Sequence, residues 1–250
     1  MRIESLLLAV TPVTTLRDDA QLTHATGFFF EREERLFLVT NRHVVHDEAS
    51  GHRPDRLEIE LHTDPANAAV TTQFSIPLYR EGQSVWRQGS DSAGPIDVAV
   101  VALDRAALPA ALLVAAFTPA HLVRQLDEIE VGTSVLIVGF PLGFHDALHH
   151  LPVARQAVVA SAFGIRFQGS GYFLTDARTH RGMSGAPVVA RVTGQASGRA
   201  DLPWRLLGVH AARLDMGNRD LQQDESLALN CAWYADILLT LTQEPAPSAT

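Results

Sequence analysis

Three short stretches, far apart along the chain, each carry one residue that could take part in nucleophilic catalysis. His43 lies at the end of an apolar, strand-like run, Asp97 lies at the start of another, and Ser184 lies in a glycine-flanked turn. A serine hydroxyl becomes a nucleophile when an imidazole takes its proton, and a carboxylate fixes the tautomer of that imidazole. The order histidine, aspartate, serine therefore predicts attack on a carbonyl carbon, with His43 as the base and Asp97 as its orienting acid.

The stretches around His43, Asp97 and Ser184 together resemble those of the trypsin-like (chymotrypsin-fold) serine peptidases. They are most similar to the bacterial branch that includes the HtrA/Deg proteases and the glutamyl endopeptidases. The likeness extends from about Ala25 to Asn230. The three stretches together are specific for this family, whereas each of them alone is not. Four further segments carry it: Thr26–Phe28, Val138–Gly143, Thr175–Ala177 and Leu207–His210.

The resemblance implies an all-β fold of two antiparallel six-stranded β-barrels with a C-terminal α-helix. It also implies a serine endopeptidase that cleaves proteins or peptides through an acyl-enzyme on Ser184 and needs no cofactor. The amides of Gly182 and Ser184 would form the oxyanion hole, where each donor is worth ~3–4 kcal/mol. The expected organisation is an N-terminal barrel at 1–117, a connection at 118–130, a C-terminal barrel at 131–231, a helix at 232–243 and a disordered tail at 244–250.

The periodicity of the chain agrees with an all-β fold. Short apolar runs separated by polar turns are typical of barrels and sandwiches. Leu57, Ile59 and Leu61 alternate with glutamates, which predicts a strand with one face toward solvent. Near the end, Trp233, Ile237 and Leu241 recur at helical spacing and predict the amphipathic helix. Eight further strands are expected, at 26–30, 36–40, 98–103, 134–138, 157–162, 171–175, 187–192 and 206–210.

Composition limits the function classes. The 250 residues are 46% hydrophobic and carry a formal net charge of −8, which argues against nucleic acid as a partner. The single cysteine, Cys231, excludes an internal disulfide and predicts a small buried apolar residue in a reducing compartment. The apolar run Leu6–Val10 is short and follows Glu4, so it predicts a strand and not a signal peptide. We therefore expect a cytoplasmic protein without a membrane segment, and the sequence does not indicate an oligomeric state.

Substrate preference is predicted from the resemblance. Thr179 and His210 would lie on two walls of the primary specificity pocket, a pair also seen in glutamyl endopeptidases and in viral 3C-type proteases that prefer glutamine. A hydroxyl and an imidazole can both donate to a carboxylate or amide oxygen. The basic neighbours expected there are Arg178, His180, Arg181 and Arg213. The hypothesis is cleavage after Glu, with Gln next; the alternative is that His210 is an ordinary strand residue and the arginines face solvent.

Three departures from the family pattern bear on activity. Met183 stands where digestive members have an aspartate that pairs with a freed N-terminus, so activation by that route is not expected. Ala211 lacks the hydroxyl that usually supports the aspartate, and Arg213 replaces a glycine that pairs with substrate backbone. These departures leave two alternatives open: a weakly active protease fold that binds extended peptides, and a latent protease that needs a partner.

Two other sequence patterns could indicate different chemistry, and neither is complete. Gly182–Ala186 is one residue away from the G-x-S-x-G elbow of α/β-hydrolases, but those enzymes carry the acid and the histidine after the serine, and the surroundings do not alternate strands with helices. His145 and His149 have i, i+4 spacing beside His150, yet no nearby set of residues completes a tetrahedral site. No metal is expected, and the three histidines are interpreted as a solvated loop.

Overall fold

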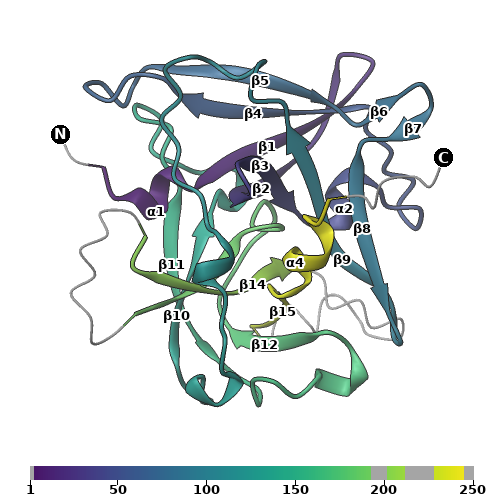
Figure 1. Ribbon diagram of the computed structural model, residues 1–250, viewed down its shortest axis with the longest axis vertical. Coiled ribbons are helices and arrows are strands. Elements are labelled where there is room, and N and C mark those ends of the chain that lie inside the picture. The colour runs from purple at the N-terminus through teal and green to yellow at the C-terminus, as the bar shows by residue number, and fades with distance from the viewer. Residues whose placement is uncertain (1–2, 193–201, 212–227, 245–250) are drawn as a thin grey trace.

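Antiparallel strands make up most of the regular structure in the computed structural model, which describes residues 3–192, 202–211 and 228–244 (Figure 1). The first half forms a seven-stranded sheet in the order β5-β4-β1-β2-β3-β9-β8. Its strands are β1 (Val10–Arg17), β2 (Ala20–Arg32), β3 (Arg35–Thr40), β4 (Arg56–His62), β5 (Thr71–Pro77), β8 (Trp86–Asp91) and β9 (Gly94–Leu103).

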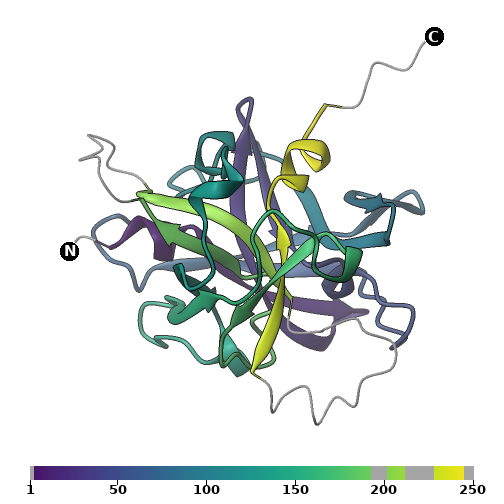
Figure 2. The ribbon, with the colours of Figure 1, turned by 90° about the horizontal axis from the view of Figure 1, so that it is seen from below.

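The second half is a closed barrel of six strands in the order β10-β11-β12-β15-β14-β13. Figures 1 and 2 show this barrel beside the seven-stranded sheet, with α4 (Ile237–Leu241) lying where the two meet. Its strands are β10 (Ser134–Gly139), β11 (Val153–Val159), β12 (Tyr172–Asp176), β13 (Pro187–Arg191), β14 (Trp204–Ala211) and β15 (Leu229–Tyr234).

Of the two six-stranded barrels that were expected, the structure therefore shows one. In the first half, the outer strands β5 and β8 do not pair with each other within the described residues. The chain between them turns aside into a separate hairpin of β6 (Tyr79–Arg80) and β7 (Gln83–Ser84), because Leu78 and Val85 close that hairpin with a backbone hydrogen bond of 3.0 Å. An open sheet with seven strands results.

Two predicted elements have different bounds. The helix expected at 232–243 begins only at Ile237, because residues 229–234 form β15 and pair with both β12 and β14. The apolar run expected as a strand at Leu6–Val10 is mostly the short helix α1 (Ser5–Leu8), and β1 begins after it. In β4 the prediction is confirmed: Leu57, Ile59 and Leu61 are buried in alternation. Of the tail expected at 244–250, residues 245–250 lie outside the described residues.

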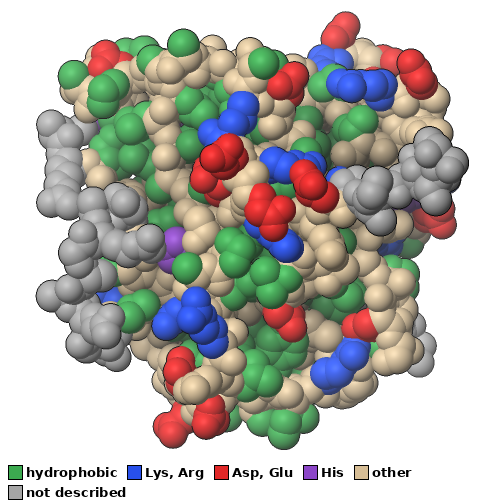
Figure 3. Space-filling view, in the orientation of Figure 1, with side chains coloured by type: hydrophobic (Ala, Val, Ile, Leu, Met, Phe, Trp, Pro, Cys, Tyr) green, Lys and Arg blue, Asp and Glu red, His purple; other side chains and the backbone are tan. Residues whose placement is uncertain are grey.

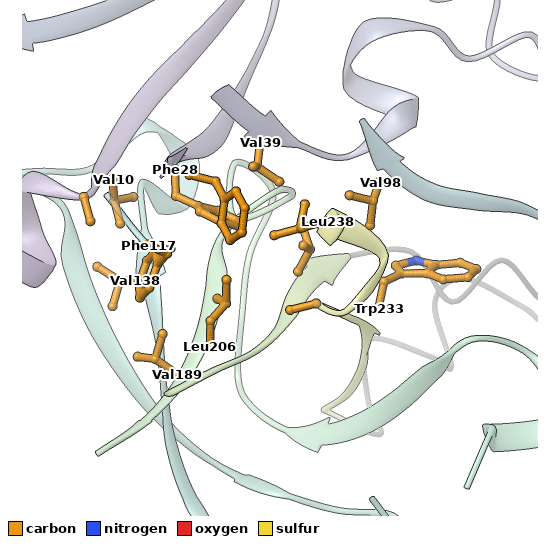
Figure 4. Close-up of a cluster of buried hydrophobic side chains, with 14 of the residues drawn as sticks. Val10, Phe28, Val39, Val98, Phe117, Val138, Val189, Leu206, Trp233 and Leu238 are labelled. Atoms are coloured by element: carbon orange, nitrogen blue, oxygen red, sulfur yellow. The ribbon is translucent and has the colours of Figure 1, made fainter. Parts of the chain in front are cut away.

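A hydrophobic cluster holds the two halves together (Figure 4). Phe28 and Phe117 meet edge to face at its centre, with ring centroids 5.7 Å apart, and each fully buried aromatic contributes about 2–3 kcal/mol. The segment after β9 also touches both halves, through bridges at Phe117 to Phe30 and at Leu122 to Leu206. Side chains from both sides line the cluster: Val10, Phe28, Val39 and Val98 from the sheet, and Val138, Val189, Leu206 and Trp233 from the barrel.

The surface carries mixed charge. On the face drawn in Figure 3, basic and acidic side chains are interspersed with hydrophobic ones. One ion pair, Arg166 with Asp91, joins the loop after β11 to the end of β8. Among the described residues, no helix combines the length and the apolar character needed to cross a membrane.

Candidate active site

His43 and Asp97 are brought together by the ends of β3 and β9. His43 lies on α2 (Arg42–Val45), one short turn beyond the end of β3 and not in the strand itself. Asp97 lies in β9 at a bulge, where the single residue Gly89 of β8 is opposite three residues of β9. A bulge of this kind bends the strand and redirects its side chains. Because the last pair of β3 with β9 is Thr40 with Ala99, Asp97 extends past β3 and faces α2.

The carboxylate of Asp97 binds His43 at two points. Its Oδ1 accepts from the backbone N–H of His43 at 2.9 Å, and its Oδ2 accepts from Nδ1 of the imidazole at 2.8 Å. An ionised carboxylate can only accept, so Nδ1 carries the proton and Nε2 of the neutral ring keeps its lone pair. Asn41 adds a 2.7 Å bond from Nδ2 to the carbonyl of Asp97. Asp97 is thus held by His43 and Asn41, although Ala211 offers no hydroxyl.

Ser184 lies in the turn between β12 and β13, and that turn packs against the middle of β2 and the end of β3. Gly185 has φ +86°, and a Cβ there would collide with the carbonyl of Thr26 and the hydroxyl of Thr40. Thr26 donates its N–H to the carbonyl of Ser184 at 2.9 Å, and Thr40 donates its hydroxyl to the carbonyl of Thr26 at 2.9 Å. Since Thr40 is three residues before His43, these contacts place the serine turn beside the histidine segment.

The serine hydroxyl itself makes no hydrogen bond within the described part of the chain, to His43 or to any other group. Ser184 is 9% exposed, whereas the side chains of His43 and Asp97 are 20% and 17% exposed. Hydrogen bonds between a nucleophile and its base are often long before substrate binds. The arrangement provides an oriented imidazole and a nearly buried hydroxyl on neighbouring segments.

The backbone amides of Gly182 and Ser184 have no hydrogen-bond acceptor among the described residues. The carbonyl groups of the same turn are engaged instead: Thr26 donates its hydroxyl to the carbonyl of Gly182 at 2.7 Å, and Leu142 donates its N–H to the carbonyl of Arg181 at 2.6 Å. Unpaired amides beside a nucleophile are the donors that an oxyanion requires. Thr26 was missed as a site residue, although it begins one of the segments that carry the resemblance.

The two predicted pocket residues each contact β15 but do not bond each other within the described residues. His210 pairs with Ala232 of β15, and Thr179 donates its hydroxyl to Oδ1 of Asn230 at 2.8 Å. Asn230 and Ala232 are two residues apart on the same strand face, about 6.6 Å along β15. Asn230 therefore holds the hydroxyl of Thr179, a contact that sequence reasoning missed. Of the basic neighbours, Arg178, His180 and Arg181 are exposed, and Arg213 lies outside the described residues.

His210 is fully buried, and neither ring nitrogen has a hydrogen-bond partner among the described residues. Loss of hydration on burial, and then the nearby charge of His43, lower the pKa of His210 to about 3. The imidazole is therefore neutral at pH 7, with one nitrogen able to donate and the other able to accept. The effect of His43 on His210 also places β14 near the His43–Asp97 pair.

The side chains of other residues singled out in the sequence take no part in these contacts, although Met183 directly precedes Ser184 in the chain. Met183 and Cys231 are buried and pack in apolar clusters. In the loop that carries His145, His149 and His150 (the histidine loop), His149 contacts Asp146 at 2.7 Å and His150 contacts Glu60 of β4 at 3.0 Å. A cavity of about 300 Å³ opens between β8, β9 and α4, and neither His43 nor Ser184 lines it.

Residues 25–198 match the family model of the trypsin-like peptidase domain. Two solved structures are similar. An HtrA-type protease with a tripeptide has a TM-score of 0.55 and 17% identity, covering 95% of this chain and 60% of its own. A serine endoprotease from Yersinia pestis has a TM-score of 0.53 and 17% identity, covering 94% of this chain and 62% of its own. The chain thus spans about three fifths of their length, and at this identity the likeness concerns the fold. No curated protein sequence matches the chain.

Proposed function

The chain belongs to the trypsin-like peptidase domain family, and from this membership we propose that it is a serine endopeptidase with Ser184 as its nucleophile. Nε2 of His43 takes the hydroxyl proton as Oγ attacks the carbonyl carbon of a peptide bond. The amides of Gly182 and Ser184 hold the resulting oxyanion. His43 then gives its proton to the leaving amine, and the acyl group stays on Ser184 until water, deprotonated by the same imidazole, releases it.

The observation that carries this proposal is the two-point contact between Asp97 and His43. One bond holds the backbone of His43 and the other its Nδ1, so the ring has one orientation and one tautomer. A histidine held only for structure gains nothing from keeping the lone pair of Nε2 unused. The anchoring of the Ser184 turn to Thr26 and Thr40 supports the same role, since it ties the turn that carries the hydroxyl to the end of the strand that leads into His43.

For specificity we propose that the pocket beside His210 and Thr179 accepts a Glu side chain, with Gln next. Support comes from the ring nitrogens of His210, which have no partner among the described residues. Because both nitrogens are buried, the proposal requires the residues that cover the ring to move before a substrate carboxylate or amide oxygen accepts from it. Because this imidazole is neutral at pH 7, it offers a hydrogen bond without a full positive charge. Binding of Glu should therefore strengthen at lower pH relative to Gln, as a bound carboxylate favours protonation of the ring.

A second candidate is a latent or weakly active peptide-binding module. The observation in its favour is the absence, within the described residues, of a hydrogen bond between Ser184 and His43. Such a protein would capture an extended peptide by strand addition and leave it intact, or cleave it only after a partner binds.

Cleavage-site mapping distinguishes these functions. Denatured protein extract is incubated with the wild type and with Ser184→Ala, and new N-termini are identified by mass spectrometry. We expect new termini only with the wild type, with Glu or Gln enriched just before the cut. Enrichment of Arg, Lys or large apolar residues there would overturn the specificity. Equal, background-level termini for both proteins would favour the binding module.

A further inference from the structure

The turn before the histidine loop lies directly against the proposed oxyanion hole. This turn, Pro141–Gly143, packs on Gly182 so closely that a Cβ at Gly182 would clash with the carbonyl of Phe140 and come within 3.0 Å of the amide nitrogen of Leu142. The N–H of Leu142 donates to the carbonyl of Arg181 at 2.6 Å. Gly182, with φ +94°, is the residue that permits this approach.

The bond from Leu142 has a geometric consequence for the next amide along the turn. Every peptide bond in the described part of the chain is trans, so the carbonyl of Arg181 and the N–H of Gly182 point in opposite directions across one planar unit. Leu142 holds that carbonyl on its own side. The N–H of Gly182 therefore points away from Leu142, where no described group accepts from it. If this peptide unit turned over, it would present an oxygen to the oxyanion in place of a donor.

Leu142 adopts a conformation that its own side chain does not explain. Its φ of 54° and ψ of 25° are in the left-handed region, which is unfavourable for leucine. The side chain is 72% exposed and gains little from packing. Backbone strain of this kind is found where the surrounding structure holds a functional group in place. The group held at Leu142 is its N–H.

The turn is fastened to the first half of the molecule. The hydroxyl of Thr26 accepts from the N–H of Phe140 at 3.1 Å while it donates to the carbonyl of Gly182. At the far end of the loop, His62 of β4 donates from Nε2 to the carbonyl of His149 at 2.7 Å, and Glu60 contacts His150. The segment from Phe140 to His150 is thus attached at both ends to strands of the sheet that carries His43.

We propose that Leu142 is a positioning residue, whose backbone N–H keeps the Arg181–Gly182 peptide in the orientation that directs the Gly182 amide at the oxyanion. The proposal rests on the proposed endopeptidase function. It concerns the backbone of Leu142 and not its side chain, so a variant that changes only the backbone donor tests it.

The test replaces the N–H of Leu142 with an ester oxygen, by ligating a synthetic segment that carries the α-hydroxy analogue of leucine. Leu142→Ala, which keeps the N–H, is the matched control. Leu142→Pro also removes the donor, but proline cannot adopt φ 54° and its variant can fail to fold. For each protein, kcat is measured per active site titrated with a fluorophosphonate, and KM is measured on the same peptide. The oxyanion is probed by the pKa of a peptidyl trifluoromethyl ketone adduct, followed by ¹⁹F NMR.

For the ester variant we expect kcat to fall about 10- to 100-fold, because one donor no longer points at the oxyanion of the transition state. KM should stay within about threefold, because binding of the substrate in its ground state does not use that donor. The adduct's pKa should rise, and Leu142→Ala should behave as the wild type. An ester variant with an unchanged kcat per active site and an unchanged adduct pKa overturns the proposal. A wild type that forms no adduct and cleaves no peptide overturns the endopeptidase function instead, together with the role of Leu142.

Discussion

Replacing His210 with methionine should change how the stability of the fold depends on pH. His210 is fully buried among apolar residues of the barrel, and both of its ring nitrogens lack partners in the described structure. Methionine has a similar volume and no ionisable group, so it fills the same space with little overpacking. The comparison of wild type with His210→Met isolates the cost of keeping this imidazole neutral.

The size of the effect follows from the pKa of His210, about 3 in the fold against 6.5 for an unperturbed histidine. At pH 7.5 the ring is neutral in both the folded and the unfolded chain and contributes no pH dependence. As the pH falls below 6.5, the unfolded chain binds a proton that the folded chain does not, so stability is lost. The loss of stability is about 2 kcal/mol at pH 5 and about 3 kcal/mol at pH 4. Below about pH 3 it stops growing, because the folded chain then binds the proton as well.

Urea unfolding at several pH values between 7.5 and 4 measures this difference. The wild type should lose about 2 kcal/mol more than His210→Met between pH 7.5 and pH 5, with equal m-values for the two proteins. Other groups, such as His52, whose pKa is lowered mainly by burial, are common to both proteins and cancel in the comparison. Parallel stability curves over this range would refute the reasoning, because they would mean that the ring is protonated in the fold or is hydrated.

Three further predictions concern the site. Asp97→Asn should lower kcat about 10⁴-fold with the melting temperature nearly unchanged, because the amide can donate to Nδ1 and select the wrong tautomer; steady-state kinetics and a thermal melt check this. Thr26→Val should lower the free energy of unfolding by about 2–4 kcal/mol, since the Phe140 amide and the Gly182 carbonyl lose their partner; chemical denaturation measures it. Gly185→Ala should cost more than about 3 kcal/mol, whereas Gly51→Ala, also at positive φ but with open space around it, should cost about 1 kcal/mol; equal costs would contradict the predicted clash.

The residues proposed to react could be singled out from the sequence because the residues next to each of them carry the structural requirement. Glycines flank Ser184, and two of them do adopt positive φ, as a tight turn that exposes a hydroxyl needs. Apolar runs beside His43 and Asp97 became β3 and β9, whose pairing brings the two residues together. In each case the structural demand is local, so a few adjacent residues show it.

The residues that support the site could not be identified in this way. The role of Thr26 depends on a carbonyl 156 residues away, and that of Asn230 on a hydroxyl 51 residues away. The bulge that turns Asp97 toward α2 arises from the register between β8 and β9, which neither strand shows by itself. The burial of His210 likewise depends on what packs over β14.

Element boundaries differed where two patterns competed. The spacing of Trp233, Ile237 and Leu241 fits a helix, but Trp233 gains backbone pairing on both sides as part of β15, and the helix starts only after that strand. The first half was expected to close into a barrel because the resemblance implies two barrels. Closure requires β5 and β8 to pair. Within the described residues they do not, and the chain between them forms the separate β6–β7 hairpin.

Covalent labelling tests the central claim most directly. The protein is treated with a biotinylated fluorophosphonate, digested and analysed by mass spectrometry, alongside Ser184→Ala and His43→Ala. The adduct should be found on Ser184 in the wild type, be missing from Ser184→Ala and form far more slowly in His43→Ala. A wild type that stays unlabelled, or that is labelled equally fast without the imidazole of His43, would contradict the proposed nucleophile and base.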